Sequence, residues 1–127
     1  RSRGLGDVYK RQDIMAVNIF VPVRTLSGGN LQRMILAREL TGEPDLIIAV
    51  YPTRGLDVGA TEYVRKVLLR ERDRGAAVLL ISEELDEILQ LSDRIAVIHN
   101  GEIMGIVRPE ETTIEEIGLM MGGALKK

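Results

Sequence analysis

Apolar residues along the chain form short runs that alternate with stretches of helical period. Two continuous runs, residues 46–50 and 76–81, are too short for helices and are typical of strands buried on both faces of a parallel sheet. An apolar stretch at residues 14–23 predicts a further short strand or a loop. Residues 1–12 are rich in glycine and charge without any period, so we expect an unassigned leader that is foreign to the domain or disordered.

Helical periodicity separates these runs, and capping residues mark the helix ends. Ser27 is a good N-cap for a first helix, which ends at Gly42. A second helix starts at Asp57 or Thr61 and ends at Gly75, a typical C-cap. Two further helices are predicted at residues 84–91 and 114–121.

The dipeptide Asn100-Gly101 lies between two apolar stretches, residues 94–99 and 102–107, and is a strong hairpin signal. The chain's only histidine, His99, is expected at the exposed end of a strand beside this turn. The order βαβαβ and then a hairpin predicts an α/β fold, with a parallel sheet, helical crossovers and a C-terminal antiparallel edge. We expect one domain over residues 13–121, followed by a flexible tail at 122–127.

Composition narrows the class of protein. The chain has 127 residues, of which 45% are hydrophobic and 28% charged, as expected for one soluble globular domain. Seventeen Lys and Arg residues against 19 Asp and Glu residues give a net charge of −2, so no nucleic-acid partner is predicted. The absence of cysteine excludes disulfides, thiolate metal sites and cysteine catalysis.

The candidate chemistry begins with Ser27, Gly28 and Gly29 at the start of the first helix. A hydroxyl and two glycines at this place expose backbone N–H groups at the positive end of the helix dipole, which favours an anion such as phosphate. On these three residues alone, a plain turn that caps the helix is the better interpretation. The residues that follow change that balance.

An ordered series of motifs surrounds these glycines. LSGGNLQR at residues 26–33 precedes the apolar strand, and PTRGLD at residues 52–57 follows it. Over roughly residues 21–107 the series resembles the second half of an ATP-binding cassette (ABC) ATPase domain, which has a P-loop NTPase fold. The resemblance covers the signature motif, the Walker B strand, the D-loop, the switch strand and the C-terminal hairpin.

Within the ABC family the chain is most similar to the ATPase subunits of bacterial simple-sugar and nucleoside importers. Those subunits fuse two cassettes in one polypeptide, and this chain resembles the C-terminal part of the second, degenerate cassette. The resemblance implies ATP and Mg²⁺ as cofactors of the full-length subunit. It also implies the first cassette and a transmembrane permease as partners, with a solute-binding protein as an indirect partner. The subunit is then peripheral to the cytoplasmic face of the plasma membrane.

The departures from the family pattern are as informative as the matches. The chain has no Gly-rich P-loop and no Gly-Lys pair. Val50 and Tyr51 stand where the family has an Asp for Mg²⁺ and a Glu that orients water, and neither side chain can do that work. Glu83 replaces the switch histidine, and we favour its interpretation as an acidic residue at a helix N-terminus. No catalytic residue and no metal ligand is therefore predicted.

The resemblance implies that a degenerate cassette of this kind still contributes to nucleotide binding. ABC cassettes pair head to tail, so that each nucleotide lies between one P-loop and the opposite signature motif. This implies that Ser27, Gly28, Gly29 and Asn30 contact the partner cassette's ATP in trans. Asp57 would be the D-loop residue that contacts the opposite cassette, and it can cap the following helix at the same time.

Two other functions remain open at this point. The chain could be a noncatalytic accessory or binding module that retains an ABC half-fold. It could also belong to a non-transport ABC protein of DNA repair or translation. Those proteins usually have coiled-coil or charged insertions and keep the acidic Walker B pair, whereas this chain has neither. The PTRGLD segment at residues 52–57 and the missing carboxylates favour transport.

The first prediction concerns nucleotide binding. We expect the purified chain neither to bind Mg-ATP tightly nor to hydrolyse it, because it lacks a P-loop and because Val50 and Tyr51 replace the acidic pair. Titration calorimetry with Mg-ATP measures this directly. A micromolar dissociation constant for the chain alone would contradict it.

Overall fold

The computed structural model describes residues 28–127. The chain divides into two compact units, the first ending at Leu79 and the second spanning Leu80–Lys127. The expected leader at residues 1–12, the expected strand or loop at 14–23 and the N-cap residue Ser27 all lie outside the described residues.

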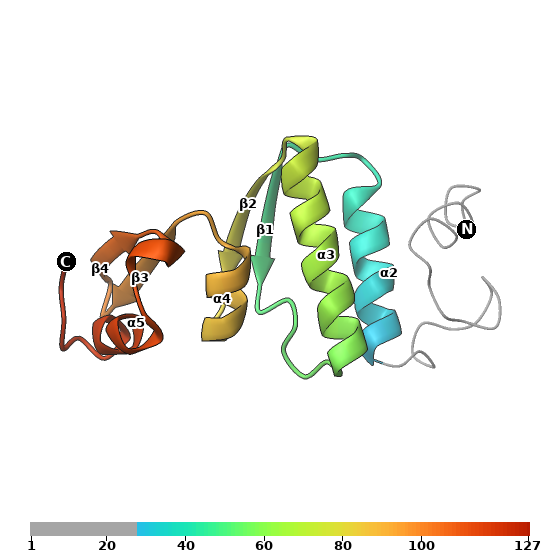
Figure 1. The fold of residues 1–127 in the computed structure, drawn as a ribbon. Helices are drawn as coiled ribbons and strands as arrows, with labels where there is room; N and C mark the ends of the chain where they lie inside the picture. The colour runs from blue at the N-terminus through green and yellow to red at the C-terminus, as the bar shows by residue number, and fades with distance from the viewer. Residues whose placement is uncertain (1–27) are drawn as a thin grey trace. The chain divides into compact units, whose positions relative to one another are not determined.

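The first unit contains two helices beside a pair of strands. The elements are α2 (Gly28–Leu40), β1 (Leu46–Val50), α3 (Val58–Arg74) and β2 (Ala77–Ile81), whose last residues pass into the second unit. Figure 1 shows α2 beside α3, and β1 and β2 pointing in the same direction. The two strands form a parallel sheet, and α3 is the crossover that a parallel pair requires.

The bounds of α3 follow from its caps. The Asp57 carboxylate accepts a hydrogen bond from the Ala60 N–H at 2.8 Å, and Asp57 is the N-cap. Gly75 ends the helix with φ at 112°, and its N–H donates to the Arg72 carbonyl. Both predicted ends are confirmed. The helix buries one apolar face, formed by Ala60, Val64, Val67 and Leu68.

One face of the β1–β2 sheet is exposed, so the prediction of strands buried on both faces is wrong. Along β1, Leu46, Ile48 and Val50 are 58%, 59% and 53% exposed, while the residues between them are half-buried. Leu79 of β2 is 51% exposed. The helices α2 and α3 lie on one side of the strands, and the described residues of this unit supply no second layer. The apolar run at residues 46–50 suits a strand with a packed layer on each face of its sheet, and the described residues of this unit provide a layer on one face only.

The second unit is a hairpin with helices packed on it. It contains α4 (Leu85–Leu91), β3 (Ile95–His99), β4 (Glu102–Val107), a 3₁₀ helix (Pro109–Glu111) and α5 (Ile114–Met121). Strands β3 and β4 are antiparallel, with Ile95 opposite Val107. Asn100 and Gly101 have φ of 48° and 78°, the positive values that a tight two-residue hairpin turn needs, which confirms the predicted turn. The core consists of Ile95, Val97, Met104, Val107, Ile117 and Met120.

The parallel pair and the hairpin are separate sheets in the described part of the chain. The α/β class, the parallel strands with a helical crossover and the C-terminal hairpin are all confirmed. The prediction that the hairpin forms the edge of the same sheet is wrong for the described residues, which form two sheets of two strands each.

The six residues after α5, predicted as a flexible tail, make specific contacts. The Lys127 N–H donates to the Met104 carbonyl at 2.7 Å, and Leu125 packs against the apolar core. His99, the last residue of β3, is half-buried rather than exposed. A Cβ at Gly123, where φ is +78°, would lie 2.6 Å from His99 Nε2. The close approach of the imidazole and the positive φ together require glycine at this position.

The second prediction concerns the exposed face of β1. We expect the purified chain to self-associate through this face, because it places several large apolar side chains in water. Ile48→Lys, on the exposed face, should raise the monomer fraction with little loss of stability. Ile47→Lys, on the half-buried face, should lower the melting temperature strongly, because it buries a charge. Sedimentation velocity and thermal melts measure both.

A wild-type chain that is monodisperse and monomeric, with a cooperative melt at high temperature, would contradict this prediction. Equal effects of the two lysine variants would also contradict the assignment of the faces.

Candidate functional site

The predicted signature residues lie at the start of α2. Gly28, Gly29 and Asn30 are its first three residues, and its first turn contains no acidic side chain. Gly28 is exposed, and a Cβ built on it would meet nothing within 4 Å. The first N–H groups of a helix have no acceptor within the helix and lie at the positive end of its dipole. Among residues 28–127, none fills the space beside Gly28, and a helix end of this kind suits phosphate oxygens.

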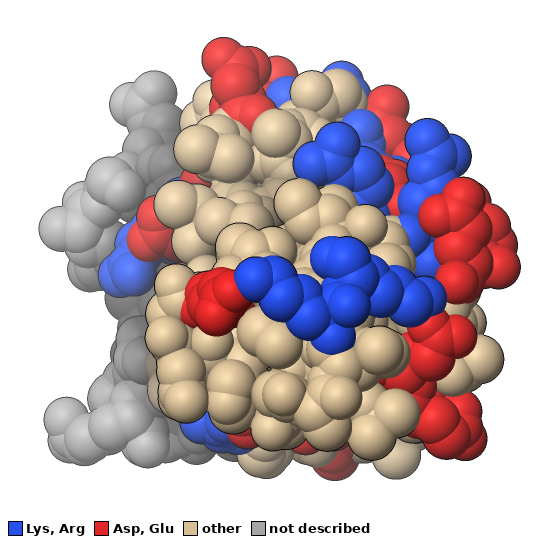
Figure 2. All heavy atoms as spheres, turned by 90° about the vertical axis from the view of Figure 1, so that its left-hand side faces the viewer, with Lys and Arg blue, Asp and Glu red and all other residues tan. Residues whose placement is uncertain are grey.

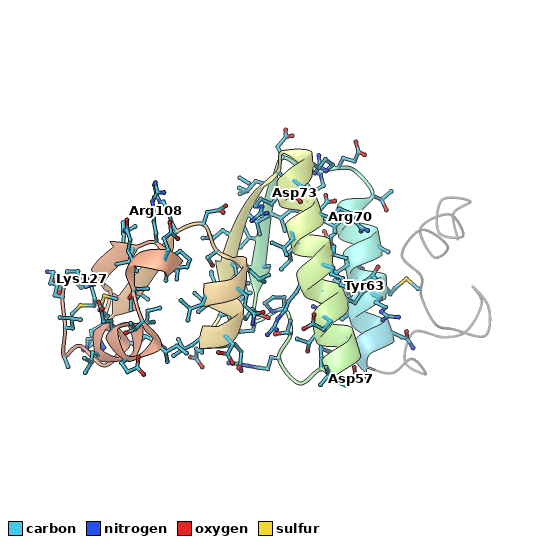
Figure 3. All side chains as sticks on the ribbon, in the orientation of Figure 1. Asp57, Tyr63, Arg70, Asp73, Arg108 and Lys127 are labelled. Carbon is cyan, nitrogen blue, oxygen red and sulfur yellow. The ribbon has the colours of Figure 1, made fainter. Side chains whose placement is uncertain are left out.

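Two polar residues connect the start of α2 to the rest of the first unit. The Gln32 side-chain amide donates to the Pro52 carbonyl at 2.7 Å. The Arg33 guanidinium lies over the ring of Tyr63, 4.5 Å from its centroid, and Tyr63 belongs to α3, which lies beside α2 (Figure 3). These contacts hold the glycines of α2 in a defined place relative to α3 and to the loop after β1. Both residues belong to the LSGGNLQR segment, but the sequence alone does not indicate these contacts.

The end of β1 and the loop after it contain the two positions predicted to be a degenerate Walker B motif, Val50 and Tyr51. Val50 is the last residue of the strand, and Tyr51 follows it with φ at +46°. The Arg54 guanidinium stacks over the Tyr51 ring at 3.9 Å from the centroid, and the Arg54 N–H donates to the Tyr51 carbonyl at 3.3 Å. No carboxylate occurs between residues 46 and 56. The end of this strand therefore presents an aromatic ring and a cation, and no acid.

Asp57 uses its side chain to cap α3. Its carboxylate accepts from Ala60, and its carbonyl accepts from the Thr61 N–H at 2.9 Å. Gly55, with φ at 74°, allows the chain to turn shortly before Asp57. The capping role predicted for Asp57 is confirmed, and its D-loop contact with an opposite cassette stays a prediction.

Glu83 belongs to the second unit, whereas the other predicted site residues with described positions belong to the first. It is exposed and directly precedes Glu84, the N-cap of α4. The Glu84 side chain makes no capping hydrogen bond, whereas the backbone N–H of Glu84 donates to the Ser82 hydroxyl at 3.0 Å. The position at a helix N-terminus agrees with the interpretation that the sequence favoured.

Charged side chains of the second unit form ion pairs at the surface. Lys126 pairs with Glu102, and Lys127 pairs with Glu116. Arg108 lies 3.9 Å from the Glu110 carboxylate. Figure 2 shows both signs of charge on the face that it views, with broad uncharged areas between them. This face therefore presents a mixed rather than a uniformly basic surface.

Within residues 28–127, no three His, Asp or Glu side chains are grouped as a metal site would require. In the same part of the chain, none of the helices combines the length and the apolar character needed to span a bilayer.

Comparison with known proteins identifies relatives over most of the chain, although no family model matches it. It is 58% identical to the nucleoside import ATP-binding protein NupA of Lactococcus lactis, with 92% of this chain covered. It is 50% identical to the guanosine import ATP-binding protein NupO of Bacillus subtilis, with 96% covered. The glucose import ATP-binding protein TsgD13 of Haloferax volcanii is 54% identical over 77% of this chain. These matches confirm the predicted resemblance.

The match is to a small part of each relative. The chain spans 23% of NupA, 25% of NupO and 18% of TsgD13. Among solved structures, the ATP-binding cassette MJ0796, a dimer in a post-hydrolysis state bound to ADP and Pi, superposes with a TM-score of 0.70 at 24% identity. The match covers 81% of this chain and 44% of that one. It confirms the predicted partial cassette fold.

The third prediction concerns the cap of α3. Asp57→Ala should lower the free energy of unfolding by about 1 kcal/mol, because it removes the acceptor for the Ala60 N–H. Asp57→Asn should retain most of that stability, since asparagine also caps helices well. Asp73→Ala is the matched control. It breaks only an exposed ion pair with Arg72 and should cost less than about 0.5 kcal/mol.

Urea unfolding followed by circular dichroism measures these differences. Equal losses for Asp57→Ala and Asp73→Ala would show that the cap contributes no more than a surface charge pair.

Proposed function

We propose that this chain acts as the C-terminal part of the second cassette in the ATP-binding subunit of a sugar or nucleoside importer. In that subunit it supplies Ser27, Gly28, Gly29 and Asn30 in trans to the ATP held by the first cassette. The names of the relatives, all import ATP-binding proteins, support the transport role. One observation supports the assignment of hydrogen-bond donors, and not of hydrolysis, to this chain. In the described part of the chain nothing fills the space at Gly28 and the first turn of α2 has no acid, while Val50 and Tyr51 stand in place of an acidic pair in the same unit.

The chemistry assigned to this chain is donation of hydrogen bonds. Backbone N–H groups at the start of α2, with the Ser27 hydroxyl, act as preorganised donors toward the γ-phosphate. Such donors need no reorganisation when charge develops on the transferring phosphoryl group, so they stabilise the transition state. The fit rests on the open space at Gly28 and on the absence of an acidic side chain in the first turn.

The remaining parts of the reaction are assigned to the first cassette. ATP and Mg²⁺ belong to the full-length subunit, where Mg²⁺ neutralises charge on the phosphates. Val50 offers no ligand to a cation, and the Tyr51 phenol is a poor base at neutral pH. This chain therefore contributes hydrogen-bond donors for the transition state at the first site, and we assign no hydrolysis to its own nucleotide position.

The proposed partners follow from the same assignment. The first cassette lies opposite the start of α2, and Asp57 contacts it through the D-loop. A transmembrane permease couples the subunit to transport, and a solute-binding protein acts through the permease. The subunit is then peripheral on the cytoplasmic face of the plasma membrane. Relatives named for nucleoside, guanosine and glucose import support the substrate class of sugars or nucleosides.

The fourth prediction tests donation by the signature residues in the full-length subunit, reconstituted with its permease. Gly29→Asp should lower ATPase turnover by about 10²–10³, by analogy with the loss of one preorganised donor, because it blocks close approach and repels phosphate. Gly42→Asp is the matched control at the other end of α2, where a Cβ would meet nothing within 4 Å, and it should retain turnover. Glu83→His should also change turnover little, since Val50 and Tyr51 leave the second cassette's own nucleotide site without a metal ligand or a base.

Full turnover in Gly29→Asp, combined with loss of turnover in Tyr51→Phe, would overturn the assignment. That result would place the chemistry at the position interpreted as degenerate.

A further inference from the structure

Tyr51 combines an unusual backbone conformation with a specific side-chain contact. Its φ of +46° lies in the left-handed region, which bulky residues rarely occupy. Such conformations persist only where surrounding contacts fix them, and they often occur at functional positions. The ring of Tyr51 lies under the guanidinium of Arg54, 3.9 Å from centroid to Cζ. The Tyr51 ring therefore stacks with Arg54, which a carboxylate at position 51 could not do.

The stack closes a four-residue turn. The Arg54 N–H donates to the Tyr51 carbonyl at 3.3 Å, so residues 51 and 54 are joined through both backbone and side chain. Pro52 and Thr53 lie between them and are buried, Thr53 to 7% exposure. The Leu56 N–H then donates to the Thr53 carbonyl at 3.2 Å. The turn therefore has a fixed shape.

The turn is also connected to the start of α2. The Pro52 carbonyl accepts the hydrogen bond from Gln32 at 2.7 Å. Gln32 lies three residues after Gly29, which is close to one helical turn. A displacement of Pro52 would therefore change the hydrogen bond that attaches α2 to this turn, about one helical turn after Gly29.

We infer that Tyr51 is a positioning residue for the signature end of its own cassette. Its stack with Arg54 fixes the turn, and the Pro52 carbonyl in that turn orients α2 through Gln32. The inference rests on the proposed function, in which α2 donates its N-terminus to the partner's ATP. Position 51, where the family has a carboxylate, then has a different role. Tyr51 acts on the other cassette's nucleotide indirectly, by positioning α2.

The test uses the full-length subunit reconstituted with its permease. Tyr51→Ala and Arg54→Gln each remove the stack, and Gln32→Ala removes the hydrogen bond. Each should lower kcat by about two- to fivefold, the effect expected from an exposed cation–π contact or a similar interaction. KM for ATP should stay unchanged, because the first cassette's P-loop holds the nucleotide. Tyr51→Phe keeps the ring face and should keep kcat within about twofold of the wild type.

A double variant separates positioning from general destabilisation. If Tyr51 acts through Gln32, Tyr51→Ala combined with Gln32→Ala should lower kcat no further than the larger single change. Arg70→Gln, an exposed arginine of α3 outside the turn, is the matched control and should leave kcat unchanged. Melting temperatures are measured alongside. If Tyr51→Ala fails to fold, Arg54→Gln tests the stack from its exposed partner.

Two results would overturn the inference. One is an unchanged kcat in Arg54→Gln and Tyr51→Ala, and the other is a double variant whose loss is the product of the single losses. Gly29→Asp, measured in the same preparation, distinguishes the failure of the proposed function from the failure of the inference. If it retains turnover, the proposed function fails. If it loses turnover while the stack variants keep theirs, only the role of Tyr51 fails.

Discussion

The hydrogen bond from Gln32 to the Pro52 carbonyl joins two segments that lie 20 residues apart in the chain. One is the start of a glycine-rich helix, and the other is the loop that leaves a parallel strand. Glycines confer little rigidity by themselves, since a backbone without Cβ atoms has many accessible conformations. The helix end can present its N–H groups in a fixed direction only because a neighbouring element holds it. Arg33, stacked on Tyr63, adds a second attachment from the adjacent residue.

The composition of the first unit then has a simple physical logic. A helix end that binds phosphate works best without nearby negative charge, because acids would repel the ligand. The first turn of α2 contains no acidic side chain, and the strand end nearest in sequence contains a valine and a tyrosine. In the proposed assignment, the missing acidic pair at residues 50 and 51 leaves the backbone donors at the start of α2 intact. The first unit therefore needs no change in its fold to combine donors at one place with no acids at another.

Features set by neighbouring residues were predictable from the sequence. Asp57 and Gly75 mark the ends of α3 because caps act within one turn, and Asn100-Gly101 fixes a hairpin through its own backbone preferences. The exposed face of β1 was not predictable, since an apolar run is the same whether or not a second layer covers it. The Tyr51–Arg54 stack and the Gln32–Pro52 bond also escaped prediction. They depend on side-chain directions and on a contact between distant segments.

The contact between Gly123 and His99 has a consequence for how this sequence can diverge. A methyl group at position 123 would overlap the imidazole, which lies on the end of the preceding hairpin strand. The left-handed backbone at that position adds a second penalty to any side chain. A side chain at position 123 therefore requires the His99 imidazole to move, and the left-handed backbone would still disfavour it. Positions 99 and 123 are coupled, because the side chain tolerated at one depends on the conformation of the other.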